Sequence, residues 1–295
     1  MKKAISLFLA LILCLALGAP ALAINEGEAR VVLGADLTDS QIGEVYKNLG
    51  ITRGSVTELT VTNDEERDYL QGLVDDSVIG TKSISCVYIQ TMAKGSGLDV
   101  TTSNINWCTK EMYESALMTA GVTDAQVKVA APFSVSGTAA LTGIYKAYED
   151  ITGTKLSTEA KQAAADELVT TAQLADGTDD AAAVSIVNQL KLILDQTKNM
   201  SDAELRDQII SIAAKSGYTL SDEEISQLIS LCRSMEKLDV NQLKSRVEDF
   251  QKTLKTLSQA SESSGKLAQW FKSIMENVGG KLSNLFQNLL SQYKK

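Results

Sequence analysis

The sequence predicts an α+β fold, in which an N-terminal mixed sheet with packed helices is followed by an all-helical C-terminal half. Up to about residue 153, strand-like apolar alternation takes turns with helical periodicity in the order β-α-β-α-β-β-α-β-α. From residue 154 onward only helical periodicity is found, and no proline follows Pro132. We therefore expect a signal peptide at 1–23, an α/β domain at 24–153, a helical domain at 154–260 and a basic amphipathic helical tail at 261–295.

Residues 1–23 have the pattern of a secretory signal peptide. Two lysines precede the apolar run from Ala4 to Leu17, and Ala21 and Ala23 have the spacing of a cleavage site. The alternative is an uncleaved membrane anchor, for which the run is short. We therefore expect a protein that is secreted or lies at the extracellular face of the cell envelope.

The first strand and helix follow from local signals. An apolar strand ends at Asp36, Thr38 and Gln41 have the spacing of a capping box, and Gly50 ends the helix that they start. The alternation over residues 55–63 then predicts the second strand.

The middle of the N-terminal half predicts a hairpin. Asn63 and Glu66 have the spacing of a cap for the helix that precedes it. Residues 82–92 and 97–107 both alternate and are separated by a glycine-containing loop, which is typical of two paired strands. A helix closed by Gly121 follows this hairpin.

Two cysteines on these neighbouring predicted strands, Cys86 and Cys108, are candidates for a disulfide, which export would permit. The alternative is that Cys86, Cys108 and Cys232 are all small buried apolar side chains.

The segment APFSVSGTAALTG, residues 131–143, predicts a strand that ends at Pro132 and a helix that begins soon afterwards. A serine there could cap the helix, and the first amides of the helix could hold an anion. The candidate ligand-binding residues are Ser134, Ser136, Gly137 and Thr138.

Two alternatives for this segment remain. Its small residues could instead let the helix pack closely on the sheet; these residues are Ala139, Ala140, Gly143 and Ala147. A nucleophilic serine is the other alternative, but the sequence offers no visible general base for it.

The helical half is predicted from its caps. Ser201 with Glu204, and Ser221 with Glu224, have capping-box spacing in front of apolar-periodic runs. Ser157 and Thr178 are further candidate caps, and the polar segment 258–266 is a candidate linker.

The last thirty residues carry a broad apolar stripe, with five lysines against one glutamate. This composition is typical of an interfacial helix, so a membrane surface or an envelope protein is a candidate partner. The alternative is that the stripe packs on the protein's own helices. The candidate contact residues are Trp270, Phe271, Ile274, Leu285, Phe286 and Leu289.

The composition excludes several classes of function. The chain has no histidine, which excludes Ser-His and Cys-His catalysis and the usual zinc sites. Its net charge is −9, and it becomes −11 if residues 1–23 with their two lysines are removed. Because nucleic-acid affinity rests on Lys and Arg, we expect no nucleic-acid partner. No phosphate-binding or dinucleotide-binding glycine pattern is present, and we expect no cofactor, metal or catalytic residue.

Two resemblances add to these expectations. The helix-strand-strand-helix-strand order over residues 64–133 resembles the ring-building motif of secretion-type assemblies, which implies a homo-oligomer. The motifs VVLGADL (31–37), ALMTAGV (116–122), APFSVSGTAALTG (131–143) and ELVTT (167–171) resemble the YpuA-like family of exported Gram-positive proteins. That resemblance implies an envelope setting and carries no catalytic residues.

We therefore expect an exported, non-enzymatic envelope protein that acts by binding or assembly at the membrane surface. The alternative is a small-ligand or anion-binding protein, or an unusual hydrolase, that uses the turn from Ser134 to Gly143.

Overall fold

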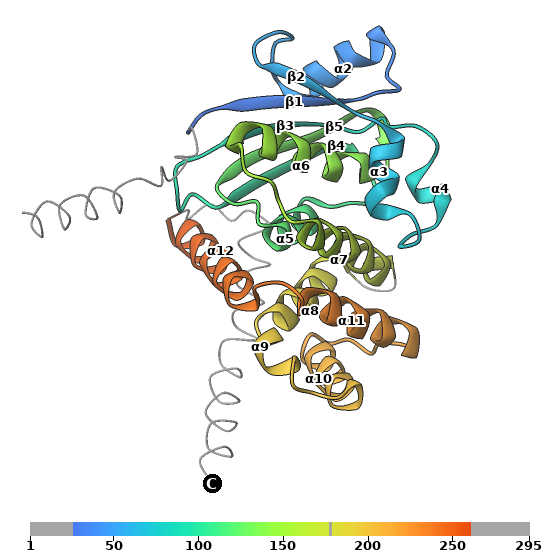
Figure 1. Cartoon of the computed structure of the whole chain (residues 1–295), viewed down its shortest axis with the longest axis vertical. Helices are drawn as coiled ribbons and strands as arrows, with labels where there is room; N and C mark the ends of the chain where they lie inside the picture. Colours follow the sequence, from blue (N-terminus) through green and yellow to red (C-terminus); the bar gives the residue numbers. More distant parts are fainter. Residues whose placement is uncertain (1–25, 177–178, 261–295) are drawn as a thin grey trace, which may run out of the picture.

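The computed structural model describes residues 26–176 and 179–260. It confirms the predicted α+β fold, because the strands lie in the N-terminal half and the described residues after it are mostly helical (Figure 1). The strands are β1 (Ala29–Gly34), β2 (Thr57–Val61), β3 (Cys86–Thr91), β4 (Leu98–Ile105) and β5 (Ala125–Val135).

The helices follow the predicted order, with one short addition, α4, after the second helix. Those of the N-terminal half are α2 (Asp39–Leu49), α3 (Asn63–Leu70), α4 (Asp76–Ile79), α5 (Lys110–Ala120) and α6 (Thr138–Thr152). Those that follow are α7 (Thr158–Asp176), α8 (Asp180–Lys191), α9 (Leu194–Thr197), α10 (Asp202–Lys215), α11 (Asp222–Met235) and α12 (Val240–Ala260).

The strands form one mixed sheet in the order β2-β1-β3-β5-β4. β1 pairs parallel to β2 and antiparallel to β3, while β5 pairs antiparallel to β3 and parallel to β4. The predicted β3–β4 hairpin is therefore wrong, since β5 lies between the two strands.

The loop between β3 and β4 shows why no hairpin forms. The Asp124 carboxylate, which directly precedes β5, accepts hydrogen bonds of 2.9 Å from the amides of Gly95 and Gly97. The Met92 amide donates to the Asp124 carbonyl oxygen over 2.6 Å. The loop is thus tied to the start of β5, which holds β3 and β4 far enough apart for a third strand.

Helices cover both faces of the sheet (Figure 1). α2 packs on one face in a small cluster that includes Val45, Tyr46 and Leu49. α6 packs on the other face against β1 and β3, and α5 lies beside β4. The capping box of Thr38 with Gln41 and the left-handed Gly50 delimit α2 as predicted.

α6 lies close to the sheet because its contact face is small. A Cβ on Gly143 would stand 3.2 Å from a methyl of Val87 and 3.4 Å from Val32. Ala139, Ala140 and Ala147 of the same helix are buried. The close-packing interpretation of these small residues is therefore confirmed.

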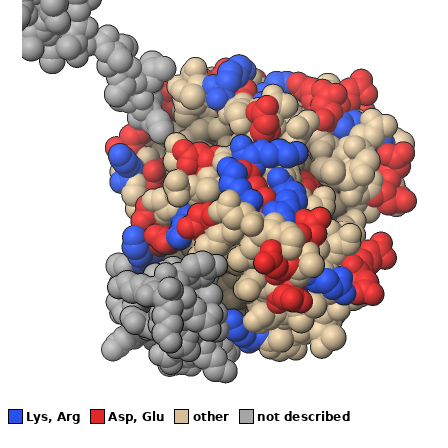
Figure 2. Space-filling model, turned by 60° about the horizontal axis from the view of Figure 1, so that its bottom comes forward, with Lys and Arg blue, Asp and Glu red and all other residues tan. Residues whose placement is uncertain are grey.

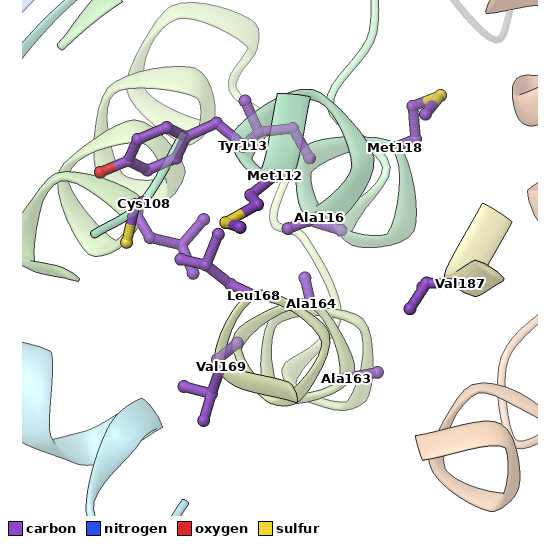
Figure 3. Packing of buried hydrophobic residues seen from close by; sticks show 14 of the residues in the cluster. Cys108, Met112, Tyr113, Ala116, Met118, Ala163, Ala164, Leu168, Val169 and Val187 are labelled. Atoms are coloured by element: carbon purple, nitrogen blue, oxygen red, sulfur yellow. The ribbon is translucent and has the colours of Figure 1, made fainter. Parts of the chain in front are cut away.

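The core continues from the sheet into the helical half. In Figure 3, Met112 and Ala116 of α5 face Ala164 and Leu168 of α7, and all four are buried in one cluster. The capping boxes of Ser201 and Ser221 are confirmed.

The remaining predictions for this half have separate outcomes. Ser157 accepts a hydrogen bond of 3.1 Å from the Ala160 amide, as its predicted capping role requires. α12 continues to Ala260 and so includes the first residues of the predicted linker. Thr178 lies outside the described residues, as do the six tail residues from Trp270 to Leu289.

The candidate disulfide is not formed, because Cys86 and Cys108 are free and buried. Cys86 lies on β3 in the cluster under α2, whereas Cys108 lies beyond the end of β4 in the main core. Cys232 is a third buried free thiol. All three act as small apolar side chains, which was the alternative interpretation.

The surface on the side of the C-terminal helices carries both signs of charge. Figure 2 shows Lys and Arg gathered near the middle of this face, with Asp and Glu spread around them. Among the described residues, no helix combines the length and the apolar character that a membrane span requires.

Candidate functional site

The strand that leads to the predicted turn is longer than expected. β5 continues through Pro132 to Val135, so the prediction that Pro132 ends the strand is wrong. Its pairing to β3 ends at Ala130, and its pairing to β4 shifts between Ala130 and Val135. Pro132 thus lies in an irregular stretch where its missing amide costs no ladder hydrogen bond.

The helix after the turn is not capped by a local serine. Its N-cap is Gly137, in the left-handed region with φ 99°, and neither Ser134 nor Ser136 caps it. The Ser136 hydroxyl instead donates to the Val78 carbonyl oxygen over 3.0 Å. The Ser85 hydroxyl, from the segment before β3, accepts a hydrogen bond of 3.0 Å from the Ala140 amide.

Gly137 contacts the buried core through Tyr113. The Tyr113 hydroxyl donates to its carbonyl oxygen over 2.5 Å. A Cβ at this position would stand 2.5 Å from the Tyr113 oxygen and 2.6 Å from a methyl of Ile105. Only glycine fits both the space and the backbone conformation.

A cavity of about 590 Å³ lies above this turn, and we call it the turn cavity. Its walls come from α3, α4, the loop before β3 and the turn itself. Ser136, Gly137 and Thr138 line it as candidate site residues, whereas Ser134 is exposed and does not. The residues that complete it are Asp36, Thr38, Gln41, Glu66, Ser77, Val78, Ile79, Gly80, Thr81, Lys82, Ile84, Ser85, Trp107, Phe133, Val135 and Ala139.

Glu66 is the residue at this site that sequence reasoning assigned wrongly. The capping box of α3 is formed by Thr62 and Glu65, one position before the predicted pair of Asn63 and Glu66. Both pairs have the same spacing, so the pattern alone could not separate them. The shift by one position turns Glu66 inward, where it is 1% exposed.

The Glu66 carboxyl has one oxygen without a partner. Oε2 accepts a hydrogen bond of 3.3 Å from the Asn63 amide group, while Oε1 is buried with no hydrogen bond. Burial raises the pKa of Glu66 to about 7, although Thr138, Asn63 and Arg67 favour the charged form. A buried, unpaired acceptor of this kind costs about 1–3 kcal/mol, which a ligand donor could offset.

Hydrogen-bond donors also belong to the lining of the cavity. Within the described part of the chain, the Thr138 and Ala139 amides at the start of α6 make no hydrogen bond. They carry the positive end of the helix dipole. An acceptor oxygen of a ligand could therefore bind beside the Glu66 carboxyl.

One wall of the cavity is attached through Arg67. Its guanidinium lies 2.7 Å from an Asp76 carboxylate oxygen and donates to the Gly80 carbonyl oxygen over 2.6 Å. These contacts hold α4 and the chain after it against α3. The lining also includes Phe133, which is 48% exposed and so lies at the rim, and the partly buried Trp107.

A second polar cluster lies in the core and has a structural role. Lys191 of α8 and Glu167 of α7 are fully buried, with Nζ and Oε1 2.5 Å apart. Ser115 and Thr119 of α5 also hydrogen bond to the Glu167 carboxylate. Burial lowers the pKa of Lys191. The motifs ALMTAGV and ELVTT supply Thr119 and Glu167, so they encode a contact between helices.

The described residues contain no group of three or more Cys, Asp or Glu side chains that could hold a metal ion. The turn cavity combines one buried carboxyl, two unbonded amides and two aromatic side chains, and it is the candidate functional site.

The fold and this cavity define an α+β protein with a cavity of about 590 Å³ at a strand-to-helix turn. Residues 33–257 match the family model described as "Protein of unknown function (DUF1002)". The chain belongs to this family. It is 41% identical over 218 residues to a Bacillus subtilis (strain 168) protein named "Uncharacterized protein YpuA", covering 73% of this chain and 74% of the relative. The resemblance to the YpuA-like family is thus confirmed. No solved structure matches the chain.

Proposed function

We propose that this chain is an exported protein of the cell envelope that binds a small ligand in the turn cavity. The observation that carries the proposal is Glu66, which lines a cavity of about 590 Å³ and whose buried Oε1 has no hydrogen-bond partner. That volume is within the range of small-ligand pockets. The signal-peptide pattern of residues 1–23 supports export.

Binding is better supported than catalysis. The Thr138 hydroxyl lies near the Glu66 carboxyl and favours its charged form. Thr138 is 2% exposed, however, so a substrate carbonyl has little access to it. The Ser136 hydroxyl is already engaged with the Val78 carbonyl oxygen. A hydrolase would need a nucleophile within reach of both a base and the substrate.

The ligand-binding proposal can be tested by identifying small molecules that co-purify with the protein. The Ser77→Trp variant places a bulky ring at the exposed wall of the cavity. Ser211→Trp, at an exposed position of α10, is the matched control. Mass spectrometry of released ligand should find one compound in the wild type and in Ser211→Trp, and much less of it in Ser77→Trp. Equal amounts in all three proteins would refute the proposal.

The export proposal has its own test. Fractionation of cells that produce the full chain should recover it outside the membrane without residues 1–23. A chain begun at residue 24 should stay in the cytoplasm. Recovery of both forms in the same compartment would contradict export.

The composition of residues 266–295 supports a second candidate function, which is docking of this segment on an anionic membrane surface. Flotation with anionic and neutral liposomes, with and without these residues, tests it. Equal binding by both chains would exclude this role. Homo-oligomerisation likewise stays a prediction, which size measurement in solution would check.

A further inference from the structure

We infer that the ligand of the turn cavity is a neutral, polyhydroxylated molecule such as a short saccharide. This inference rests on the ligand-binding function proposed above and adds the chemical class of the ligand. Three features of the cavity support it: the hydroxyl groups of the lining, the mixture of positive and negative charge, and the aromatic side chains at the rim.

The lining is rich in groups that both donate and accept hydrogen bonds. Six of its side chains carry hydroxyls, namely Thr38, Ser77, Thr81, Ser85, Ser136 and Thr138. The Ser85 oxygen accepts from the Ala140 amide, which leaves its own proton available to the cavity. A ligand with many hydroxyls can use such a lining at several points, because each hydroxyl also donates and accepts.

The charges around the floor disfavour ions of either sign. An anion at the Thr138 and Ala139 amides would lie beside the Glu66 carboxyl, which repels it when ionised. A cation at Glu66 would lie at the positive end of α6. The other two charged side chains of the lining, Asp36 and Lys82, have opposite signs. A neutral hydroxyl can donate to the carboxylate and accept from the amides.

The depth of Glu66 selects for a small contacting group. Glu66 is 1% exposed and its Oε1 is buried, so a ligand hydroxyl would contact this oxygen after a small rotation of the side chain, whereas a phosphate or carboxylate group would need more room. The partly buried Trp107 and the 48% exposed Phe133 offer ring faces at the rim. Aromatic faces of this kind pack well on the C–H surface of a sugar ring.

The test compares three classes of probe by isothermal titration calorimetry on the full chain without residues 1–23. The neutral probes are maltotetraose, cellotetraose and tetra-N-acetylchitotetraose. Inorganic phosphate is the anion and spermidine is the cation. The Phe133→Ala variant removes the rim ring, and Ile210→Ala, which shortens a side chain 42% exposed on α10, is its control.

We expect a neutral tetrasaccharide to bind, with Kd raised about tenfold in Phe133→Ala, which is the effect of losing about 1.4 kcal/mol. Ile210→Ala should leave Kd unchanged. Glu66→Gln keeps an acceptor oxygen without the charge, so saccharide affinity should change less than threefold.

Other results would overturn the inference in distinct ways. If phosphate alone binds, and binds more tightly to Glu66→Gln, the ligand is an anion. If spermidine alone binds, and Glu66→Gln weakens its binding more than tenfold, the ligand is a cation. Either result would leave the ligand-binding function intact. If no probe binds but a ligand still co-purifies in the Ser77→Trp comparison, only the ligand class is wrong. If neither is found, the proposed function fails as well.

Discussion

Gly137 connects the core to the turn cavity through a single backbone position. We expect Gly137→Ala to lower the free energy of unfolding by about 2–4 kcal/mol, because the added Cβ meets Tyr113 and Ile105 and the backbone has φ 99°. Gly153 is the control: its φ is 64°, and a Cβ there meets nothing within 4 Å. Gly153→Ala should therefore lose only about 1 kcal/mol. Equal losses in urea unfolding would contradict the crowding at Gly137.

Glu66 makes the stability of the protein depend on pH. The pKa of this carboxyl is raised by burial from 4.5 to about 7 in the folded protein. Between these values the folded state holds a proton that the unfolded chain has released. The contribution of Glu66 is therefore fully present below pH 4.5 and is lost as the pH rises through 7.

The Glu66→Gln variant removes this dependence. We expect the stability of the variant relative to the wild type to rise by roughly 2 kcal/mol from pH 5.5 to pH 8. Urea unfolding at both values measures it. Burial also raises the pKa of Glu114 to about 8, so both proteins keep a common slope from that residue. Parallel pH profiles of variant and wild type would show that Glu66 does not titrate in this range.

The burial of Glu66 could not be predicted from the sequence. Thr62 with Glu65, and Asn63 with Glu66, have the same capping spacing, and the choice between them depends on which side of α3 meets α6. That information is tertiary. The turn from Ser136 to Thr138 was placed correctly, because glycine and hydroxyl residues mark it locally.

At the scale of elements, the Glu167–Lys191 pair joins α7 to α8 and both to α5. We expect Lys191→Met to lower the free energy of unfolding by about 3–5 kcal/mol, because it leaves the Glu167 carboxylate buried without its cation. The double variant Glu167→Gln with Lys191→Met should be less destabilised than Lys191→Met alone.

Chemical denaturation of these variants checks the buried pair. Lys252→Met, which breaks the exposed pair with Asp249 on α12, is the surface control and should change stability little. A small effect of Lys191→Met, similar to the control, would contradict a stabilising ion pair between Lys191 and Glu167.

Most elements were predicted because their signals are local. The caps at Thr38, Ser201 and Ser221 and the glycines after α2 and α5 mark helix ends within a few residues. The prediction of a hairpin was wrong because the order of strands in a sheet depends on residues far apart in the sequence. The alternating patterns of β3 and β4 are compatible with pairing to any neighbouring strand. The extra strand between them is selected by the core and by Asp124.

At the scale of the whole molecule, the reactivity of the three described cysteines reports whether the fold keeps them buried and apart. We expect Cys86, Cys108 and Cys232 to be protected from alkylation in the native protein, because all are buried and burial raises the pKa of each thiol to about 12. After unfolding without a reductant, all three should react. Peptide mass spectrometry that finds Cys86 and Cys108 unlabelled together would contradict the separation of these residues in the fold.

The position of β5 also sets the order in which the protein can acquire its structure. β3 and β4 are synthesised before β5, and their alternating patterns allow them to pair with each other while β5 is still absent. Any such pairing would have to open before β5 could enter between the two strands. Gly137 lies two residues beyond the end of β5, so we expect the turn cavity to form only once β5 has joined the sheet. Ligand binding during refolding would thus report completion of the sheet, and substitutions that weaken β3–β4 pairing alone would hasten it.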